Sequence, residues 1–219
     1  MNRPIRSYVL RQGRTTPAQQ RALKELFPKY GIAFSSAKLH SARYAPLVLE
    51  VGSGMGETTI AIAKAHPEAD FIAVEVHAPG VGALLNAIER ERLTNVRVIR
   101  HDAVEVLERM VEDASLVAIH LFFPDPWPKK RHHKRRLVQP PLASLMARKL
   151  MPGGTLHAAT DWADYAEQMA AVFGAEPLLE PATSGFAARP LTKFASRGQR
   201  LGHPIRDLYF RRRTAPAAR

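Results

Sequence analysis

Cysteine is absent from this chain of 219 residues. Its absence excludes disulfide bonds, a cysteine nucleophile and every zinc site that needs thiolate ligands. It also fits a reducing cytoplasm, which is where we expect the protein to act. No apolar run approaches the roughly 20 residues of a membrane-spanning helix, so we expect no membrane partner. Residues 1–14 hold arginines but lack the apolar stretch of a secretory signal.

Acidic residues are scarce in the three segments that carry most of the positive charge. Segments 1–24, 129–136 and 189–219 hold 21 of the 32 lysines and arginines, but only one of the 20 acids, Asp207. The rest of the chain is net acidic, although the formal net charge of the whole is +12. A basic periphery on an acidic body favours a phosphate backbone as partner, and we find no amphipathic basic helix that would insert into a membrane.

Short apolar runs alternate with helical patterns along most of the chain. Strands are expected at 47–51, 71–76, 96–99, 116–123 and 155–159, and helices at 57–66, 79–93, 103–111, 138–150 and 161–173. This alternation predicts an α/β fold with a mostly parallel sheet and helices on both faces. A turn is expected at 151–154, and a late antiparallel strand at 208–210.

A short helix is predicted close to the N-terminus. Thr16 is suited to be its N-cap, because a proline follows at the first helical position and Gln19 can close a capping box. The helix is expected to end near residue 27. We therefore predict a basic N-terminal extension with a short helix at residues 1–31, and a single domain at 32–219.

A glycine turn follows the first predicted strand, and acids stand at the ends of three strands. Gly52 and Gly54 allow the backbone to approach a ligand closely. Glu75 can accept hydrogen bonds from both hydroxyls of a ribose, and Asp102 is suited to accept one from an adenine amine. These residues indicate an adenosine-type cofactor, with helix capping as the structural alternative for Glu75 and Asp102.

Two adenosine-type cofactors compete for this turn, a dinucleotide and S-adenosylmethionine. The glycines from Gly52 to Gly56 are spaced G-x-G-x-G, whereas the dinucleotide fingerprint is G-x-G-x-x-G. Glu50 precedes them by two residues, where it would repel a pyrophosphate and attract a sulfonium or amino group. The pattern resembles that of S-adenosylmethionine-dependent methyltransferases with a Rossmann-like sheet, which implies that fold here.

The fourth predicted strand leads into the loop Pro124-Asp125-Pro126-Trp127-Pro128 and then into a basic strip. Three prolines exclude a helix in the loop and favour an extended chain. In an open parallel sheet, ligands bind at the carboxyl ends of the strands, so Asp125 is a candidate for the reaction centre. Trp127 has two open interpretations, stacking on a base or anchoring the loop. His132 and His133 lie in a cationic loop, so we expect them to contact phosphate or solvent and predict no metal site.

The segment Pro124–His132 is similar to the signature of the bacterial tRNA (guanine-N7-)-methyltransferase family. The resemblance extends over nearly the whole chain, through Arg6–Arg14, Glu50–Gly54, Thr160-Asp161, Leu191–Phe194, Arg197-Gly198 and Leu201–His203. It implies methyl transfer from S-adenosylmethionine to N7 of guanine 46 in the tRNA variable loop. The family usually has an acid directly after T-x-F, where this chain has Ala195, so that segment lacks one expected carboxylate.

The resemblance also implies roles for individual residues. Cofactor contacts would involve Glu50, Glu75, Asp102 and Asp125, and substrate contacts would involve Lys129, Asp161, Thr192 and Lys193. The strip residues Arg131, Lys134, Arg135 and Arg136 are expected to bind RNA phosphates through their charge. Monomer and homodimer both remain open.

The chemistry of guanine N7 agrees with a carboxylate at the loop. This nitrogen has a lone pair and no proton to remove, so the transfer needs alignment and no strong base. Methylation makes the purine cationic, and Asp125 is our candidate for stabilising that charge. It could equally accept from the guanine N1–H and amino group. The base must be exposed before it reacts, at a cost of about a few kcal/mol.

Two other function classes remain as alternatives. A methyltransferase for a small molecule or protein would be expected to have an acidic or apolar substrate face, which the three basic segments oppose. A non-catalytic RNA-binding protein with the same fold would be expected to lose the cofactor acids, which are intact here.

Overall fold

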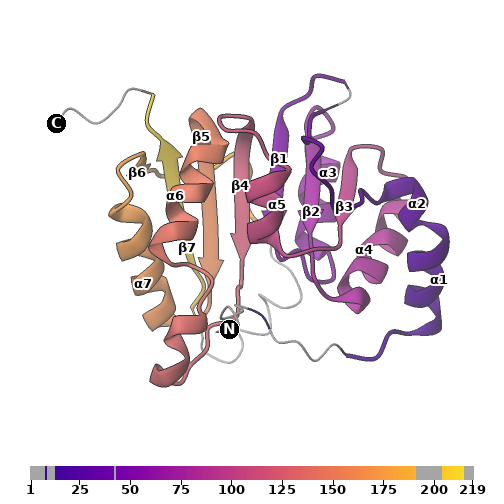
Figure 1. Ribbon diagram of the computed structural model, residues 1–219, viewed down its shortest axis with the longest axis horizontal. Coiled ribbons are helices and arrows are strands. Elements are labelled where there is room, and N and C mark those ends of the chain that lie inside the picture. The colour runs from indigo at the N-terminus through magenta and orange to yellow at the C-terminus, as the bar shows by residue number, and fades with distance from the viewer. Residues whose placement is uncertain (1–7, 9–12, 42, 191–203, 215–219) are drawn as a thin grey trace.

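One twisted sheet forms the centre of the molecule (Figure 1). The structure is a computed structural model that describes residues 8, 13–41, 43–190 and 204–214. Within these residues the sheet has seven strands in the order β3-β2-β1-β4-β5-β7-β6. The strands are β1 (Leu47–Val51), β2 (Asp70–Val74), β3 (Val96–Ile99), β4 (Leu116–Phe122), β5 (Leu150–Thr160), β6 (Leu179–Pro181) and β7 (Arg206–Arg212).

The first five strands along the chain run parallel, and β7 and β6 are antiparallel to their neighbours. The buried apolar runs explain this arrangement, because strands covered on both faces carry continuous hydrophobic residues. β1 is buried along its whole length. The expected α/β fold is confirmed, including the late antiparallel strand beside β5.

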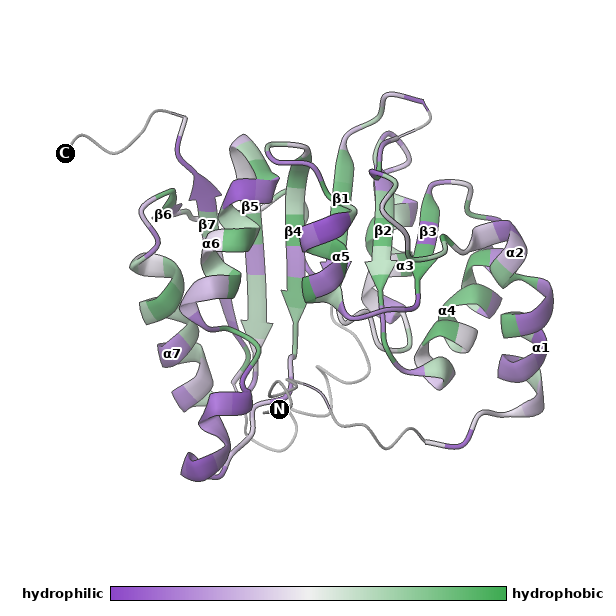
Figure 2. Ribbon diagram, in the orientation of Figure 1, coloured by the Kyte–Doolittle hydropathy of each residue, from purple (hydrophilic) through white to green (hydrophobic). Residues whose placement is uncertain are grey.

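Helices cover both faces of the sheet, as predicted. They are α1 (Pro17–Glu25), α2 (Phe27–Tyr30), α3 (Glu57–Ala65), α4 (Ala78–Glu91), α5 (Ala103–Arg109), η1 (Lys130–Arg135), α6 (Pro140–Lys149) and α7 (Ala163–Gly174). One hydrophobic cluster joins α5, α6 and α7 to the sheet, and a second cluster joins α1, α3 and α4 to the other face. Figure 2 shows the central strands mostly in green, whereas η1 at the lower left is purple.

The capping box predicted at the first helix is present. The Thr16 hydroxyl accepts a bond from the backbone N–H of Gln19 at 3.2 Å, and the Gln19 side chain accepts one from the Thr16 N–H at 2.8 Å. Ala22 on this helix is fully buried, and α1 packs against α4. The division at residue 31 stays a prediction, but the helix of the extension is part of the main core.

Four local features differ from the sequence prediction. The first helix ends at Glu25, and Phe27–Tyr30 form the separate short helix α2. The turn predicted at 151–154 lies inside β5, where the register with β4 shifts between Leu116 and Ala118. β6 was not predicted, and the basic strip forms the 3-10 helix η1. No helix among the described residues is both long and apolar enough to span a bilayer.

Candidate cofactor and substrate site

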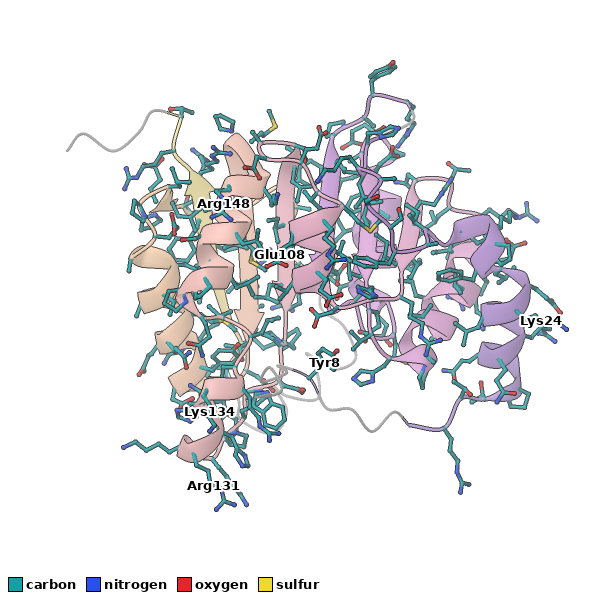
Figure 3. All side chains as sticks on the ribbon, viewed as in Figure 1. Tyr8, Lys24, Glu108, Arg131, Lys134 and Arg148 are labelled. Atoms are coloured by element: carbon teal, nitrogen blue, oxygen red, sulfur yellow. The ribbon has the colours of Figure 1, made fainter. Side chains whose placement is uncertain are left out.

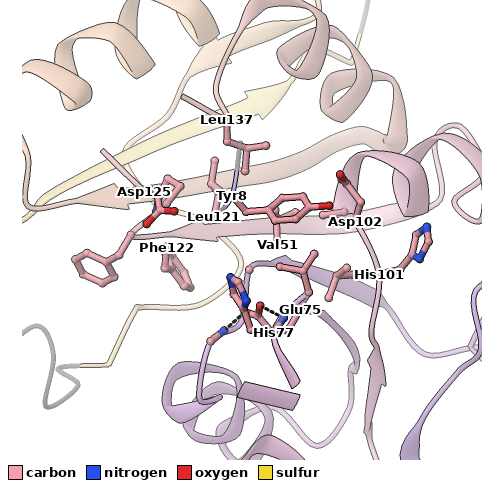
Figure 4. Close-up of a pocket in the computed structure, with 17 residues that line it drawn as sticks. Tyr8, Val51, Glu75, His77, His101, Asp102, Leu121, Phe122, Asp125 and Leu137 are labelled. Carbon is pink, nitrogen blue, oxygen red and sulfur yellow. Dashed lines mark hydrogen bonds between the residues drawn. The ribbon is translucent and has the colours of Figure 1, made fainter. Parts of the chain in front are cut away.

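A cavity of about 260 Å³ opens at the carboxyl ends of β1, β2 and β4 (Figure 4). This edge of a parallel sheet is where the fold binds ligands. Five of the six residues predicted to contact the cofactor line the cavity: Gly52, Gly54, Glu75, Asp102 and Asp125. The structure thus brings together side chains that are separated by up to about seventy positions of sequence.

The sixth residue, Glu50, lines a second cavity of about 300 Å³, which the glycine turn also lines. The two cavities share Gly52, Gly54, Phe122 and Phe123. An elongated ligand with an uncharged end and a cationic end therefore has two adjoining spaces, with carboxylates in each.

The glycine turn between β1 and α3 leaves room for a ligand. Gly52 and Gly54 have φ angles of 71° and 55°, a region in which residues with a side chain are strained. A Cβ atom built on either glycine would meet nothing within 4 Å. The turn is therefore an open cradle that side chains would fill, which fits a group bound against backbone.

Glu75 fixes the position of this turn from the end of β2. One of its carboxylate oxygens accepts a bond from the Gly54 N–H at 2.8 Å, and the other accepts one from the His77 N–H at 2.8 Å. The side chain is buried, with 6% of the residue exposed. Each carboxylate oxygen has a second lone pair, so the group can still accept bonds from a ribose. Figure 4 shows both bonds as dashed lines.

Asp102 caps a helix and also lines the first cavity. It is the N-cap of α5, where its Oδ1 accepts a bond from the Val104 N–H at 2.9 Å. It also lines the first cavity, where Figure 4 shows it across from Asp125 with the Tyr8 ring between them in this view. Capping and ligand contact are therefore compatible at this residue.

Glu50 is a buried acid beneath the second cavity. Its Oε2 accepts a bond from the Thr59 hydroxyl at 2.6 Å, and 4% of the residue is exposed. Burial raises the pKa of Glu50 to about 7, because the loss of hydration outweighs the bond from Thr59, and the charge of Glu75 adds to the rise. A cationic ligand group would favour the ionised form, so the site is suited to such a group.

Asp125 stands at the solvent-exposed rim of the first cavity. Partial desolvation raises the pKa of Asp125, with His77 lowering it and Glu75 raising it. The loop around it is strained, because Phe123 and Trp127 have φ angles of 51° and 43°. Such positions cost about 1–3 kcal/mol each and concentrate at functional sites.

The basic strip next to the loop divides into exposed and buried members. Lys129 is the N-cap of η1, and Arg131 and Lys134 extend into solvent at one end of the molecule (Figure 3). Arg135 lies with its guanidinium 5.0 Å from the centre of the Trp127 ring. Arg136 differs from the other predicted RNA contacts, because its side chain is 2% exposed and its donors are bonded within the protein.

Of the remaining predicted substrate contacts, the structure describes only Asp161. Asp161 follows β5 and is partly buried, but it lines neither of them. Thr192 and Lys193 lie outside the described residues, as does Ala195. The prediction that these residues contact substrate therefore stays a prediction.

The sequence prediction gave no site role to several residues that line the first cavity, among them Tyr8, His77 and His101. His77 had a signal that was not used, since it is a polar residue two positions after Glu75 at the same strand end. Tyr8 lies in the segment Arg6–Arg14, which resembles the family but carries no sign of a contact with this cavity. No group of three or more potential metal ligands occurs among residues 8, 13–41, 43–190 and 204–214.

Comparison of the sequence with known proteins shows which family the chain belongs to. A model of a family described as putative methyltransferases matches residues 44–208. The tRNA (guanine-N(7)-)-methyltransferase of Nitrosospira multiformis is 54% identical over 97% of this chain and 96% of its own. That of Thiobacillus denitrificans is 56% identical over 95% of this chain and 96% of its own. The chain belongs to the bacterial tRNA (guanine-N7-)-methyltransferase family. The resemblance to this family that the sequence motifs predicted is confirmed.

A solved structure supports the fold of this family member. The 16S rRNA methyltransferase KamB superposes with a TM-score of 0.56 over 80% of this chain and 95% of its own, at 16% identity. At that identity the likeness concerns the fold alone. The architecture is therefore that of the Rossmann-like methyltransferases, and the open glycine turn, the carboxylate of Glu75 and the buried acid Glu50 all fit S-adenosylmethionine.

Proposed function

We propose that this protein transfers a methyl group from S-adenosylmethionine to N7 of guanine 46 in the variable loop of tRNA. Relatives with the tRNA (guanine-N(7)-)-methyltransferase name align along almost the whole chain at 54–56% identity, and this observation carries the proposal. The convergence of Gly52, Gly54, Glu75, Asp102 and Asp125 on one cavity supports it. The exposed cations of η1 support a polyanionic substrate.

The roles of the residues follow from their positions. Glu75 and the glycine turn would hold the ribose of S-adenosylmethionine, Asp102 would accept a hydrogen bond from the adenine, and Glu50 would pair with the cationic end of the cofactor. When bound, S-adenosylmethionine supplies a methyl group on a positively charged sulfur. Asp125 lies at the rim, where a base entering from solvent would approach, and its carboxylate stabilises the charge that develops on the purine.

A direct assay tests this function. The protein is incubated with methyl-labelled S-adenosylmethionine and unmodified tRNA, and the labelled nucleoside and its position are then mapped. We expect 7-methylguanosine at position 46. Label at another base or position would overturn the finer proposal, and no label in tRNA would overturn the function itself.

Cofactor affinity is expected to depend on pH through Glu50. The pKa of Glu50 is raised to about 7, and the cationic cofactor binds best when this acid is ionised. Affinity measured by calorimetry should therefore rise about tenfold between roughly pH 6 and pH 8. The stability of the protein without cofactor should fall as the pH rises from about 4.5 to about 7, between the ordinary and the raised pKa of this acid, and should then level off, because the folded state holds this proton more tightly than the unfolded chain. Glu50→Gln should remove both trends, and an unchanged slope in this variant would exclude Glu50 as their source.

Reversing the charge of the exposed strip should weaken tRNA binding. Arg131→Glu with Lys134→Glu removes two cations that extend into solvent. The dependence of log affinity on log salt should flatten by about 0.7–0.9 for each lost phosphate contact. Arg148→Glu is the matched control, since Arg148 is exposed on α6 away from the loop (Figure 3). If the double variant keeps the wild-type salt slope, the strip does not contact phosphate.

A further inference from the structure

Arg136 is the last residue of the basic strip, but the structure buries it. Its side chain is 2% exposed, whereas Arg131 and Lys134, on the short helix η1 that Arg136 caps, are exposed. A buried cation must have its charge and its donors satisfied inside the protein, or the fold pays a large desolvation penalty. The partners of Arg136 therefore indicate what it does.

The guanidinium joins the proline loop to helix α7 through three hydrogen bonds. Nε donates to the carbonyl of Pro126 at 2.8 Å. One terminal nitrogen donates to Oε1 of Gln168 at 2.7 Å, and the other donates to Oδ1 of Asp164 at 2.6 Å. The group also lies 4.8 Å from the centre of the Tyr165 ring. Three acceptors in different directions match the planar fork of arginine, which a lysine cannot reproduce.

The prolines of the loop that Arg136 holds limit the hydrogen bonds that its backbone can donate. Pro124, Pro126 and Pro128 have no N–H, so these residues can only accept hydrogen bonds. Phe123 and Trp127 are in the left-handed region, with φ angles of 51° and 43°. A strained segment persists only where its surroundings hold it. The Pro126 carbonyl, bonded by Arg136, lies between these two strained residues.

Asp125 is the residue immediately before Pro126, so the same bond restricts its carboxylate. Asp125 lines the first cavity together with Glu75, and it is the candidate for stabilising the methylated base. Release of the Pro126 carbonyl would let the loop relax and move this carboxylate. A misplacement of about 1 Å can cost on the order of 10²-fold in rate.

We infer that Arg136 is a positioning residue that holds Asp125 at the reaction site, and that it does not bind RNA. This inference rests on the proposed function, because it concerns the carboxylate assigned to that reaction. Asp164, half of whose side chain is exposed, is the counter-charge, and the His133 ring nitrogen lies 3.7 Å from the same carboxylate. Through its bonds to Asp164 and Gln168, Arg136 therefore connects α7 to the loop that follows β4, and so fixes the position of that loop.

Arg136→Lys separates positioning from phosphate binding, because it keeps the charge and loses the fork. We expect the single-turnover rate of methyl transfer, at saturating tRNA and cofactor, to fall about tenfold or more. The salt slope of tRNA binding and the cofactor affinity should stay at their wild-type values. Arg148→Lys makes the same change at an exposed position on α6 and should keep the wild-type rate. A wild-type rate in Arg136→Lys would overturn the inference.

A double-variant cycle tests whether the effect passes through Asp125. In the Asp125→Ala background, Arg136→Lys should cause little further loss of rate, since residues that act as a unit are not additive. A full additional loss would mean that Arg136 acts elsewhere, and would overturn the inference. Gln168→Ala removes one of the three acceptors and should cause a smaller loss, which keeps the test valid if Arg136→Lys folds poorly.

Hydrogen exchange gives a readout that needs no activity. Amides of residues 129–137 and of Trp127 should exchange faster in Arg136→Lys, while those of α4 stay unchanged, and Arg148→Lys should match wild type. Unchanged exchange in the loop would overturn the inference even if no tRNA were methylated. Faster exchange without any methylated guanine in the wild-type assay would instead locate the failure in the proposed function.

Discussion

Asp125→Ala is expected to lower the rate of methyl transfer by about 10²-fold or more. Asp125 lies at the rim of the cavity that Glu75 and the glycine turn also line. The purine gains a positive charge as N7 is methylated, and a nearby carboxylate stabilises that charge more in the transition state than in the ground state. Affinity for tRNA should remain near wild type, because phosphate contacts dominate it.

Asp125→Asn distinguishes the two roles open to this carboxylate. The amide keeps the size of the side chain and one acceptor oxygen, but it has no charge. A role in charge stabilisation predicts nearly the same loss as for alanine, whereas a role in accepting bonds from the guanine predicts partial recovery. Single-turnover rates with bound tRNA measure this directly. A near-normal rate of methyl transfer in Asp125→Ala would mean that Asp125 has no catalytic role.

Much of the fold was predictable because its strands are buried on both faces. Such strands are short continuous apolar runs, and β1 and β3 have the bounds that their sequences predict. The antiparallel neighbour of β5 was predicted as well, within two residues at each end. Strand ends then indicated where acids and glycines would meet, because parallel strands end at the same edge.

The missed features depend on contacts that local sequence does not contain. Met151–Gly154 has the composition of a turn, but β4 pairs with β5 on both sides of it through a shift in register. β6 has only three residues and ends in Pro181, so its apolar pattern is too short to detect. β6 forms because its backbone pairs with the antiparallel strand β7.

The burial of Arg136 was unpredictable for the same reason. In sequence it is one of six cations within eight residues, and charge runs are usually exposed. Its partners Asp164 and Gln168 lie 28 and 32 residues further along the chain. Arg131 and Lys134 have the same charge as Arg136 but are exposed. The difference in burial comes from α7, which packs beside the loop and supplies the partners of Arg136.

Glu75→Ala is expected to weaken cofactor binding more than loss of the ribose contact alone would. This carboxylate accepts bonds from the N–H groups of Gly54 and His77, both at 2.8 Å. Its removal leaves two backbone donors and two ribose hydroxyls without an acceptor. The two backbone donors lack an acceptor with and without the cofactor, so they lower the affinity only by releasing the turn from its shape. Each ribose hydroxyl left without an acceptor costs about 1–3 kcal/mol in the complex, which lowers the affinity by about five- to 150-fold.

Two further variants complete this test: Glu75→Gln keeps the size of the side chain but removes its charge, and Glu108→Ala is the control. In Glu75→Gln, the amide nitrogen must face either the Gly54 or the His77 N–H, and two donors repel each other, so the loss should approach that of alanine. Glu108 is an exposed acid on α5, and its replacement should leave cofactor affinity unchanged. Calorimetry with S-adenosylmethionine measures all three. Full affinity in Glu75→Ala would mean that the ribose binds elsewhere and that the glycine turn holds its shape without this carboxylate.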